Sequence, residues 1–414
     1  MKTSIRLCLI IPALLAVCPA PSAAQPLAFE DVIRNLRNPD PKVRISSVRL
    51  LRDASYPEAV VPMARLVNDP IDEIQLEVIA AELSFFLVEP VPPRRKVALL
   101  VEVRSDDQAG RAFEMGPLVA WPKPAPAELI SELLKALDDE HPKVRQEAIY
   151  TLGVIGAGAI AGENAEQLIK ALDHYDPAIR AGAARVIGRV RLPGAGESLM
   201  KAMNDSSDQV RNASMRALGD LREESAVKAL NDQLTYSGKG EPAYSALDAL
   251  ARIAHPSSAP LFKERLADRD PWMRRAAAEG LGRLAEASAF DALHAGVGGD
   301  DSEMVRAAMA FALLKIGRGQ VVRLVDYLDS KKMAPQIHGY LLELGPAIVP
   351  ELLPRLQEPG DTMRCSLVDA LGALGDQSTV TALSPLLQQG NREIVKAAAR
   401  AIERIKLRTQ GADS

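Results

Sequence analysis

Asp270-Pro-Trp-Met-Arg-Arg-Ala-Ala-Ala-Glu-Gly-Leu-Gly-Arg-Leu284 is the stretch that decides the fold of this chain. Asp270 is a favourable helix N-cap, because its carboxylate can accept a hydrogen bond from a free amide of the first turn. Pro271 suits the first helical position, where no amide hydrogen is needed. Apolar or small residues then recur at steps of three and four, as on one face of a helix: Met273, Ala277, Gly280, Leu281 and Leu284. The small members of this stripe would let a neighbouring helix approach closely.

The same pattern recurs along most of the 414 residues with a period near 31. Its first apolar residue, which we call the anchor, occurs at eleven places: Val43, Ile74, Val144, Ile179, Val210, Pro242, Met273, Val305, Met333, Met363 and Ile394. A period of this length without strand-like alternation predicts a repeated pair of helices. We therefore predict an all-α fold, an α-solenoid in which roughly 11–12 two-helix units stack into a superhelix.

A family resemblance follows from the repeated pattern Asp-Pro-x-Val-Arg-x-x-Ala-x-x-Ala-Leu-Gly-x-Ile. It resembles the HEAT repeat, most closely the short bacterial kind found in phycobilisome-lyase-like proteins. Residues 139–155 and 208–221 are good copies, and the resemblance covers nearly all of residues 29–408. It implies stacked helix pairs and, because such solenoids mostly serve as binding scaffolds, no particular chemical activity.

The period divides the chain into N-terminal repeats at 25–87, a proline-rich stretch at 88–126, a main solenoid at 127–408 and a disordered tail at 409–414. The interval of 70 residues between anchors Ile74 and Val144 is about two periods, which predicts one degenerate unit inside it. Seven prolines flank and interrupt this stretch: Pro90, Pro92, Pro93, Pro117, Pro122, Pro124 and Pro126. A hinge, or a partner-binding loop bearing Trp121, is the alternative to a decayed repeat.

The N-terminus has the organisation of a secretory signal peptide. Lys2 and Arg6 precede an apolar run at 7–17 that is far too short to span a bilayer. Small residues then lead up to Ala24, after which we expect cleavage, giving an exported and periplasmic protein with residues 1–24 removed. Lipidation of Cys18 is the alternative, although Val17 is bulkier than the small residue that usually precedes a lipidated cysteine.

Composition and motifs argue against several classes of function. The formal charge of −4 does not suit a general nucleic-acid binder. The five histidines have no His or Cys at ligand spacing, and no zinc-hydrolase, phosphate-loop or serine-nucleophile motif is present. The glycines at 156, 158 and 162 end a repeat helix, so they do not form a dinucleotide fingerprint. We therefore expect no catalytic residues, no metal and no cofactor.

An arginine follows the anchor in seven of the eleven units. These residues are Arg44, Arg145, Arg180, Arg211, Arg274, Arg306 and Arg364. We predict a structural ladder in which each arginine pairs with an acidic residue at the turn of its own or the next unit. The acidic candidates are Asp40, Asp139, Asp176, Asp208, Asp270 and Glu303.

Positions six and ten places after each anchor should share one face of the second helices, away from the apolar positions. On a solenoid this face lines the concave surface. In the central units it is rich in arginine with aromatic residues nearby, a composition found in interface hot spots. The candidate partner-binding residues are Tyr150, Arg185, Arg189, Arg216, Tyr244, Arg252, Arg283, Phe311 and Lys315. An ordinary charged helix face is the competing interpretation.

Two functions from different classes remain open. The first is an exported, non-catalytic scaffold whose concave surface binds a protein partner or an anionic polymer of the cell envelope. The second is a chromophore lyase or chaperone-lyase relative, which only the repeat subtype suggests. A lyase would need a nucleophile or a set of residues for binding a bilin, and the export signal argues against it. The sequence identifies neither the ligand nor the oligomeric state.

Overall fold

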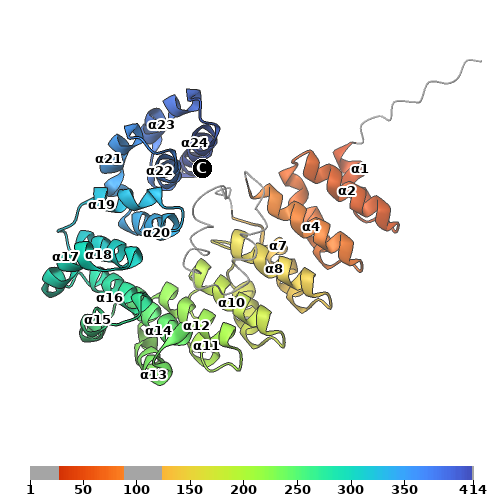
Figure 1. Cartoon of the computed structure of the whole chain (residues 1–414). Helices are drawn as coiled ribbons and strands as arrows, with labels where there is room; N and C mark the ends of the chain where they lie inside the picture. Colours follow the sequence, from red (N-terminus) through yellow and green to blue (C-terminus); the bar gives the residue numbers. More distant parts are fainter. Residues whose placement is uncertain (1–27, 88–123, 413–414) are drawn as a thin grey trace, which may run out of the picture.

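The computed structural model describes residues 28–87 and 124–412 of the chain. These residues form 22 α-helices with short 3-10 turns and no β-strand among them. The helices pair into eleven consecutive units that follow an arc (Figure 1). Around the middle of the chain the first helices α13, α15 and α17 lie on the outer side of the arc, and the second helices α14, α16 and α18 on the inner side. The predicted all-α solenoid is confirmed.

The bounds of the helices show a short first helix and a longer second helix in most units. The first helices are α1 (Phe29–Asn35), α3 (Val60–Ala64), α7 (Ala127–Lys135), α9 (Glu163–Lys170), α11 (Gly196–Ala202), α13 (Val227–Ser237), α15 (Ala259–Arg265), α17 (Phe290–Gly299), α19 (Val321–Val325), α21 (Val349–Leu352) and α23 (Gln377–Leu383). The second helices are α2 (Pro41–Asp53), α4 (Asp72–Phe85), α8 (Pro142–Ile155), α10 (Pro177–Val190), α12 (Asp208–Leu221), α14 (Gly240–Ile253), α16 (Pro271–Arg283), α18 (Glu303–Lys315), α20 (Ala334–Leu344), α22 (Asp361–Leu374) and α24 (Arg392–Ala412).

Second helices begin where the sequence pattern places a cap. The Asp270 carboxylate accepts a hydrogen bond of 2.9 Å from the amide of Trp272, with Pro271 as the first helical residue. Asp40 and Asp176 cap α2 and α10 in the same way. An aspartate followed by proline thus satisfies a free amide and presets the helical φ angle at the start of the helix.

Close helix contacts explain the glycine that follows leucine in many units. A Cβ atom built on Gly282 of α16 would lie 2.6 Å from the Cα of Ala312 in α18. The same construction on Gly188 of α10 gives 2.9 Å to the Cα of Ala217 in α12. Both distances are too short for a side chain, so glycine and alanine let consecutive second helices pack backbone to backbone. The buried aliphatic residues of all units form one continuous core along the solenoid.

Helix α7 packs on α3 and α8 packs on α4, so the second and third units are direct neighbours in the stack. The degenerate unit predicted between anchors Ile74 and Val144 stays a prediction. At the C-terminal end the structure corrects the predicted organisation: α24 continues to Ala412, into the stretch predicted to be a disordered tail.

Three sequence predictions lie outside the described residues. These are the signal peptide, the lipidated Cys18 and the loop bearing Trp121. Within the described ranges, no helix combines the length and the apolarity that crossing a membrane requires.

Candidate functional site

The arginines after the anchors connect neighbouring units. Arg274 of α16 makes a two-pronged contact with Asp300 of the next unit, with N–O distances of 2.8 and 2.9 Å. Its third nitrogen donates to the Asp268 carbonyl, six residues earlier in the chain. Arg44 and Arg180 bind Asp69 and Asp205 in the same way.

The aspartates of this ladder lie at the turn between the two helices of a unit. The Oδ1 atom of Asp205 also accepts a hydrogen bond of 2.8 Å from the amide of Ser207. Hydrogen bonding to Arg180 outweighs burial and lowers the pKa of the Asp205 carboxyl below its ordinary value. These arginine contacts are therefore used within the chain and are not available to a ligand.

The ladder partners differ in part from those predicted. Arg145 pairs with Asp176 of the next unit at 2.7 Å, and Arg211 lies against Asp208 of its own helix. The remaining paired members use Asp69, Asp205 and Asp300, whereas the predicted Asp40 and Asp270 cap their own helices. Arg306 donates to a backbone carbonyl. Arg364 donates to a backbone carbonyl and to the side chain of Gln389, and it lies 3.7 Å from the Asp361 carboxylate of its own helix.

A second set of arginines, here called the arginine band, lies on the second helices: Arg185, Arg189, Arg216, Arg252 and Arg283. Carboxylates of the chain itself neutralise several of its members. Arg252 binds Asp248 of its own helix at 2.8 Å and Asp220 of the preceding unit at 2.5 Å. Arg216 forms an ion pair with Glu241.

Two further residues of the predicted binding face have different surroundings. Arg189 donates to the Gly153 carbonyl of the preceding unit at 2.5 Å. Lys315 is half-buried and has no ion pair among the described residues. The arginine band is thus a row of cations that are largely neutralised or engaged by the chain.

Arg283 forms a brace between units that are not adjacent. It binds Glu343, sixty residues further along in α20, with N–O distances of 3.0 and 3.1 Å. It also contacts Glu279 at 3.3 Å, and the Tyr340 hydroxyl donates to the same carboxylate at 2.5 Å. Burial opposes the charge of Arg283, but Glu343 and Glu279 outweigh it and raise the pKa of Arg283. The brace joins α16 to α20 across the inner side of α18.

The aromatic members of the predicted binding face are buried, so their predicted exposure is wrong. Tyr150 and Phe311 have no exposed surface, and Tyr244 is 6% exposed. Phe311 stacks on Tyr340 with ring centroids 4.4 Å apart, and Tyr244 meets Trp272 edge to face. Each second helix packs against second helices on both sides and against its own first helix, which leaves only a narrow strip for solvent.

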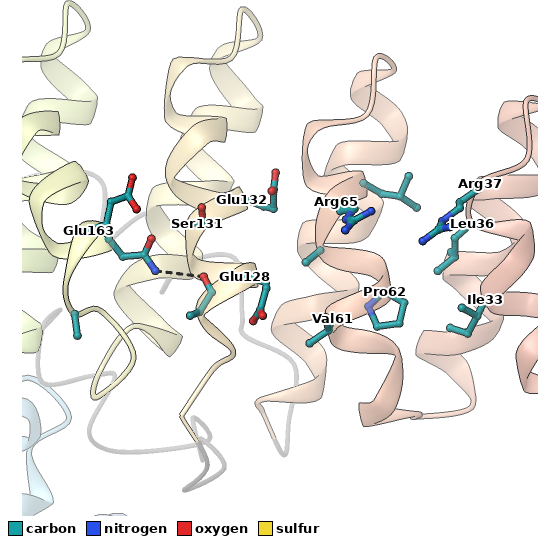
Figure 2. A pocket seen from close by; sticks show the side chains of 15 residues that line it. Ile33, Leu36, Arg37, Val61, Pro62, Arg65, Glu128, Ser131, Glu132 and Glu163 are labelled. Carbon is teal, nitrogen blue, oxygen red and sulfur yellow. Dashed lines mark hydrogen bonds between the residues drawn. The ribbon is translucent and has the colours of Figure 1, made fainter.

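A different hollow, here called the first-helix groove, runs across the first four units and has a volume of about 790 Å³ (Figure 2). It is bordered by helices α1, α3, α7 and α9 and the turns beside them. Its lining residues are Ile33, Leu36, Arg37, Val61, Pro62, Ala64, Arg65, Leu66, Ala127, Glu128, Ser131, Glu132, Ala161, Glu163 and Asn164. The volume falls within the range of ordinary ligand sites in proteins.

The groove is apolar along α1 and α3 and has charged residues of opposite sign at its two ends. Leu36 and Ala64 are buried beneath it, and Val61 is 47% exposed. Arg37 and Arg65 lie on the side of α1 and α3, whereas Glu128 and Glu163 lie on the side of α7 and α9 (Figure 2). None of these four charged side chains has an ion pair within the described ranges.

Three hydrogen bonds from two asparagine side chains hold the walls of the groove together. The Asn68 amide donates to the carbonyl and the carboxylate of Glu132, at 3.0 and 2.7 Å. The Asn164 amide donates to the Ala127 carbonyl at 3.2 Å, the dashed line of Figure 2. Because short side chains such as Ala64 and Ala161 line the space between these helices, the neighbouring side chains do not fill it.

Comparison with known proteins identifies the repeat. Models described as HEAT repeats match residues 165–241 and 232–314, and a model of the HEAT repeat matches residues 129–159. The protein contains HEAT repeats. The resemblance inferred from the sequence is thereby confirmed. No curated protein sequence matches the chain.

Solved structures with similar folds are other solenoids at low sequence identity. An engineered protein is 20% identical, with a TM-score of 0.40, and the match covers 91% of this chain and 98% of that one. The complex of CpcE and CpcF of phycocyanin lyase from a Nostoc species is 17% identical, with a TM-score of 0.34 and coverage of 74% and 93%. Kap121p is 14% identical, with a TM-score of 0.40 and coverage of 92% and 42%.

One HEAT unit carries a carboxyl group at a core position. Glu82 of α4 lies eight places after its anchor, where most other units have leucine or isoleucine. Its side chain is fully buried, and neither carboxylate oxygen has a hydrogen-bond partner in the part of the chain that the structure describes. Burial therefore raises the pKa of Glu82 well above its ordinary value. Among the described residues, no three His, Cys, Asp or Glu side chains converge as a metal site would require.

Sequence reasoning missed both the brace and the groove. The brace joins residues sixty positions apart, and no pattern within one HEAT repeat indicates which units meet across another. The groove depends on small residues in the second, third and fourth units and on a short α3, and none of these features stands out in the sequence. Glu82 could have been found from the sequence, because most other units have leucine or isoleucine eight places after their anchor.

Proposed function

We propose that this protein is an exported, non-catalytic HEAT-repeat scaffold that binds a protein partner through the first-helix groove. The observation that carries the proposal is the set of four exposed charges, unpaired among the described residues, around a partly apolar groove. A partner can complete these ion pairs, while the apolar side chains of α1 and α3 supply hydrophobic contact area.

The arginine band supports binding less well than the groove does. An anionic polymer would have to compete with Asp220, Asp248 and Glu241 for guanidinium groups that already have carboxylate partners. Breaking such pairs costs interaction energy before any is gained. We therefore favour a protein partner at the groove over a polymer on the concave face.

Site-specific photocrosslinking tests this proposal. Val61 in the groove and Val322 on α19 are both apolar and similarly exposed, at 47% and 41%. Each is replaced with a photoreactive amino acid in the full-length protein, which is irradiated in the native cell envelope. We expect a discrete crosslinked polypeptide from position 61 and none from position 322.

A third position tests the concave face in the same experiment. Lys315 lies on the predicted concave face and has no ion pair among the described residues. A crosslink from position 315 without one from position 61 would move the site to the concave face and overturn the groove proposal.

Export is a separate part of the proposal, supported by the charged start and apolar run of residues 1–24. Mass spectrometry of the protein from its native source should find a chain that begins at Gln25. An acylated chain beginning at Cys18 would show a lipoprotein instead. An unprocessed chain beginning at Met1 would contradict export altogether.

A further inference from the structure

We propose that the first-helix groove recognises an extended polypeptide segment with an acidic end, an adjoining apolar stretch and a basic end. This inference rests on the proposed function, because it specifies the chemistry of the partner at the same groove. It follows from the order in which charged and apolar side chains line the four units.

The two ends of the groove have opposite charge. Arg37 follows α1 and Arg65 follows α3, so the charged lining residues of the first two units are both cations. Glu128 lies in the first turn of α7 and Glu163 in the first turn of α9, so the next two units contribute the unpaired anions. A partner with uniform charge would be attracted at one end and repelled at the other.

The third acidic residue of the lining does not change this order. Glu132 is held by Lys135 at 2.8 Å and by the Asn68 amide. Its charge is therefore partly satisfied inside the chain, and it stands on the same side as Glu128. The groove thus keeps a positive end and a negative end.

The apolar side chains of the groove lie on the same two helices as its arginines. Val61 and Pro62 are exposed on α3, Ile33 is half-buried on α1, and Leu36 lies beneath them. A partner that covered these residues with apolar side chains would gain about 25 cal/mol for each Å² removed from water. The bound segment should therefore have an apolar stretch next to its acidic end.

The spacing of the units sets the length of the segment. Packed helices lie about 8–10 Å apart, so the centres of the cationic and anionic pairs are separated by two unit spacings, roughly 16–20 Å. An extended chain advances about 3.3 Å per residue, so about five or six residues span this distance. The acidic and basic ends of the partner segment should therefore be about five or six residues apart.

Synthetic peptides of defined charge pattern provide the test. The first peptide has a pair of aspartates, an apolar stretch of about four residues and a pair of lysines. Two matched peptides carry aspartates at both ends or lysines at both ends. Binding to the full-length protein is measured by fluorescence anisotropy, and we expect the mixed peptide to bind about tenfold more tightly than either uniform one.

A charge reversal in the protein should change this preference. The variant Arg37→Glu/Arg65→Glu makes both ends of the groove acidic, so it should lose the mixed peptide's advantage and bind the lysine-ended peptide best. The control Arg269→Glu/Arg323→Glu makes the same change of charge at exposed arginines outside the groove. The control should keep the preference of the unaltered protein.

The outcomes separate this inference from the proposed function. Equal binding of all three peptides, or no binding of any, overturns the charge pattern even if position 61 still crosslinks to a protein. Loss of the crosslink at position 61 overturns the groove as a protein-binding site. If the control variant also switches preference, net charge decides binding and the inference is wrong.

Discussion

The arginine band and the first-helix groove both hold basic side chains, but these side chains have different surroundings. In the band, Arg252 has carboxylates from its own helix and from the preceding unit, and Arg283 has two from different units. In the groove, Arg37 and Arg65 have no ion pair among the described residues. The paired arginines are mostly buried, whereas the unpaired ones are exposed.

The difference shows how a repeat stack uses charge. Side chains on the second helices lie against the next second helix, so an unpaired charge there would be partly removed from water at a high cost. Side chains on the first helices of the initial four units face a hollow and remain hydrated. An arginine-rich face on a solenoid is therefore evidence for binding only where the structure leaves the arginines without partners.

The largest effect should come from breaking the brace. Arg283→Met removes the cation that joins Glu279 and Glu343, although Glu279 keeps its pair with Arg275 at 2.7 Å. Removing one partner of a buried pair costs about 3–5 kcal/mol. The free energy of unfolding, measured by chemical denaturation followed by circular dichroism, should fall by that amount. Arg216→Met is the matched control, since its pair with Glu241 is more exposed. If Arg283→Met lowers the free energy of unfolding by no more than Arg216→Met does, the brace is not important for stability.

A smaller loss is expected in the arginine ladder. Arg274→Gln removes a two-pronged pair with Asp300, and hydrogen bonds to charged groups contribute about 1.5–3 kcal/mol. Arg306→Gln removes a hydrogen bond to the Asp300 carbonyl and should cost about 1 kcal/mol. Thermal unfolding of both variants checks this order. The ladder interpretation fails if Arg306→Gln is the more damaging change.

Glu82 tests the rule that polar groups on second helices need partners. Glu82→Leu restores the leucine found in most units and should raise the free energy of unfolding by about 1–3 kcal/mol at neutral pH. Because folding raises the pKa of this carboxyl, the folded protein keeps a proton that the unfolded chain releases. The contribution of Glu82 to the stability of the unaltered protein should therefore be most favourable below the ordinary carboxyl pKa and become less favourable as pH rises towards the raised pKa.

The pH dependence of Glu82 is measured against the same variant. Denaturation at a series of pH values should show the gap between Glu82→Leu and the unaltered protein widening as pH rises. A gap that stays constant would mean that Glu82 is ionised in the folded protein.

The smallest effect on stability should come from the groove. Arg37→Glu/Arg65→Glu changes two exposed, unpaired side chains, so the free energy of unfolding should change by less than about 0.5 kcal/mol for each. Peptide binding by the unaltered protein should weaken as salt is added, because exposed charges are screened. A large loss of stability in this variant would show that the groove arginines hold the fold together.

Several features of the fold could be predicted because they depend on residues close together in sequence. Asp270 and Pro271 specify where α16 begins, and the recurrence of small and apolar residues specifies which face packs on the neighbouring helices. The sequence predicted that the ladder arginines pair with acidic residues at the turns, because these contacts join adjacent units at a constant spacing. Its partners were predicted less well, because a capping aspartate and a bridging aspartate occupy similar turns.

The sequence by itself determined the period, the helix pairs and the HEAT-repeat class, because each is a repeated local pattern that nearest neighbours reinforce. Only the tertiary structure decided that α8 stacks directly on α4, that Arg283 reaches Glu343 and that the first four units enclose a groove. These features depend on how far each unit is rotated against the next. That rotation depends on the packing of several units together, so the sequence of a single repeat does not determine it.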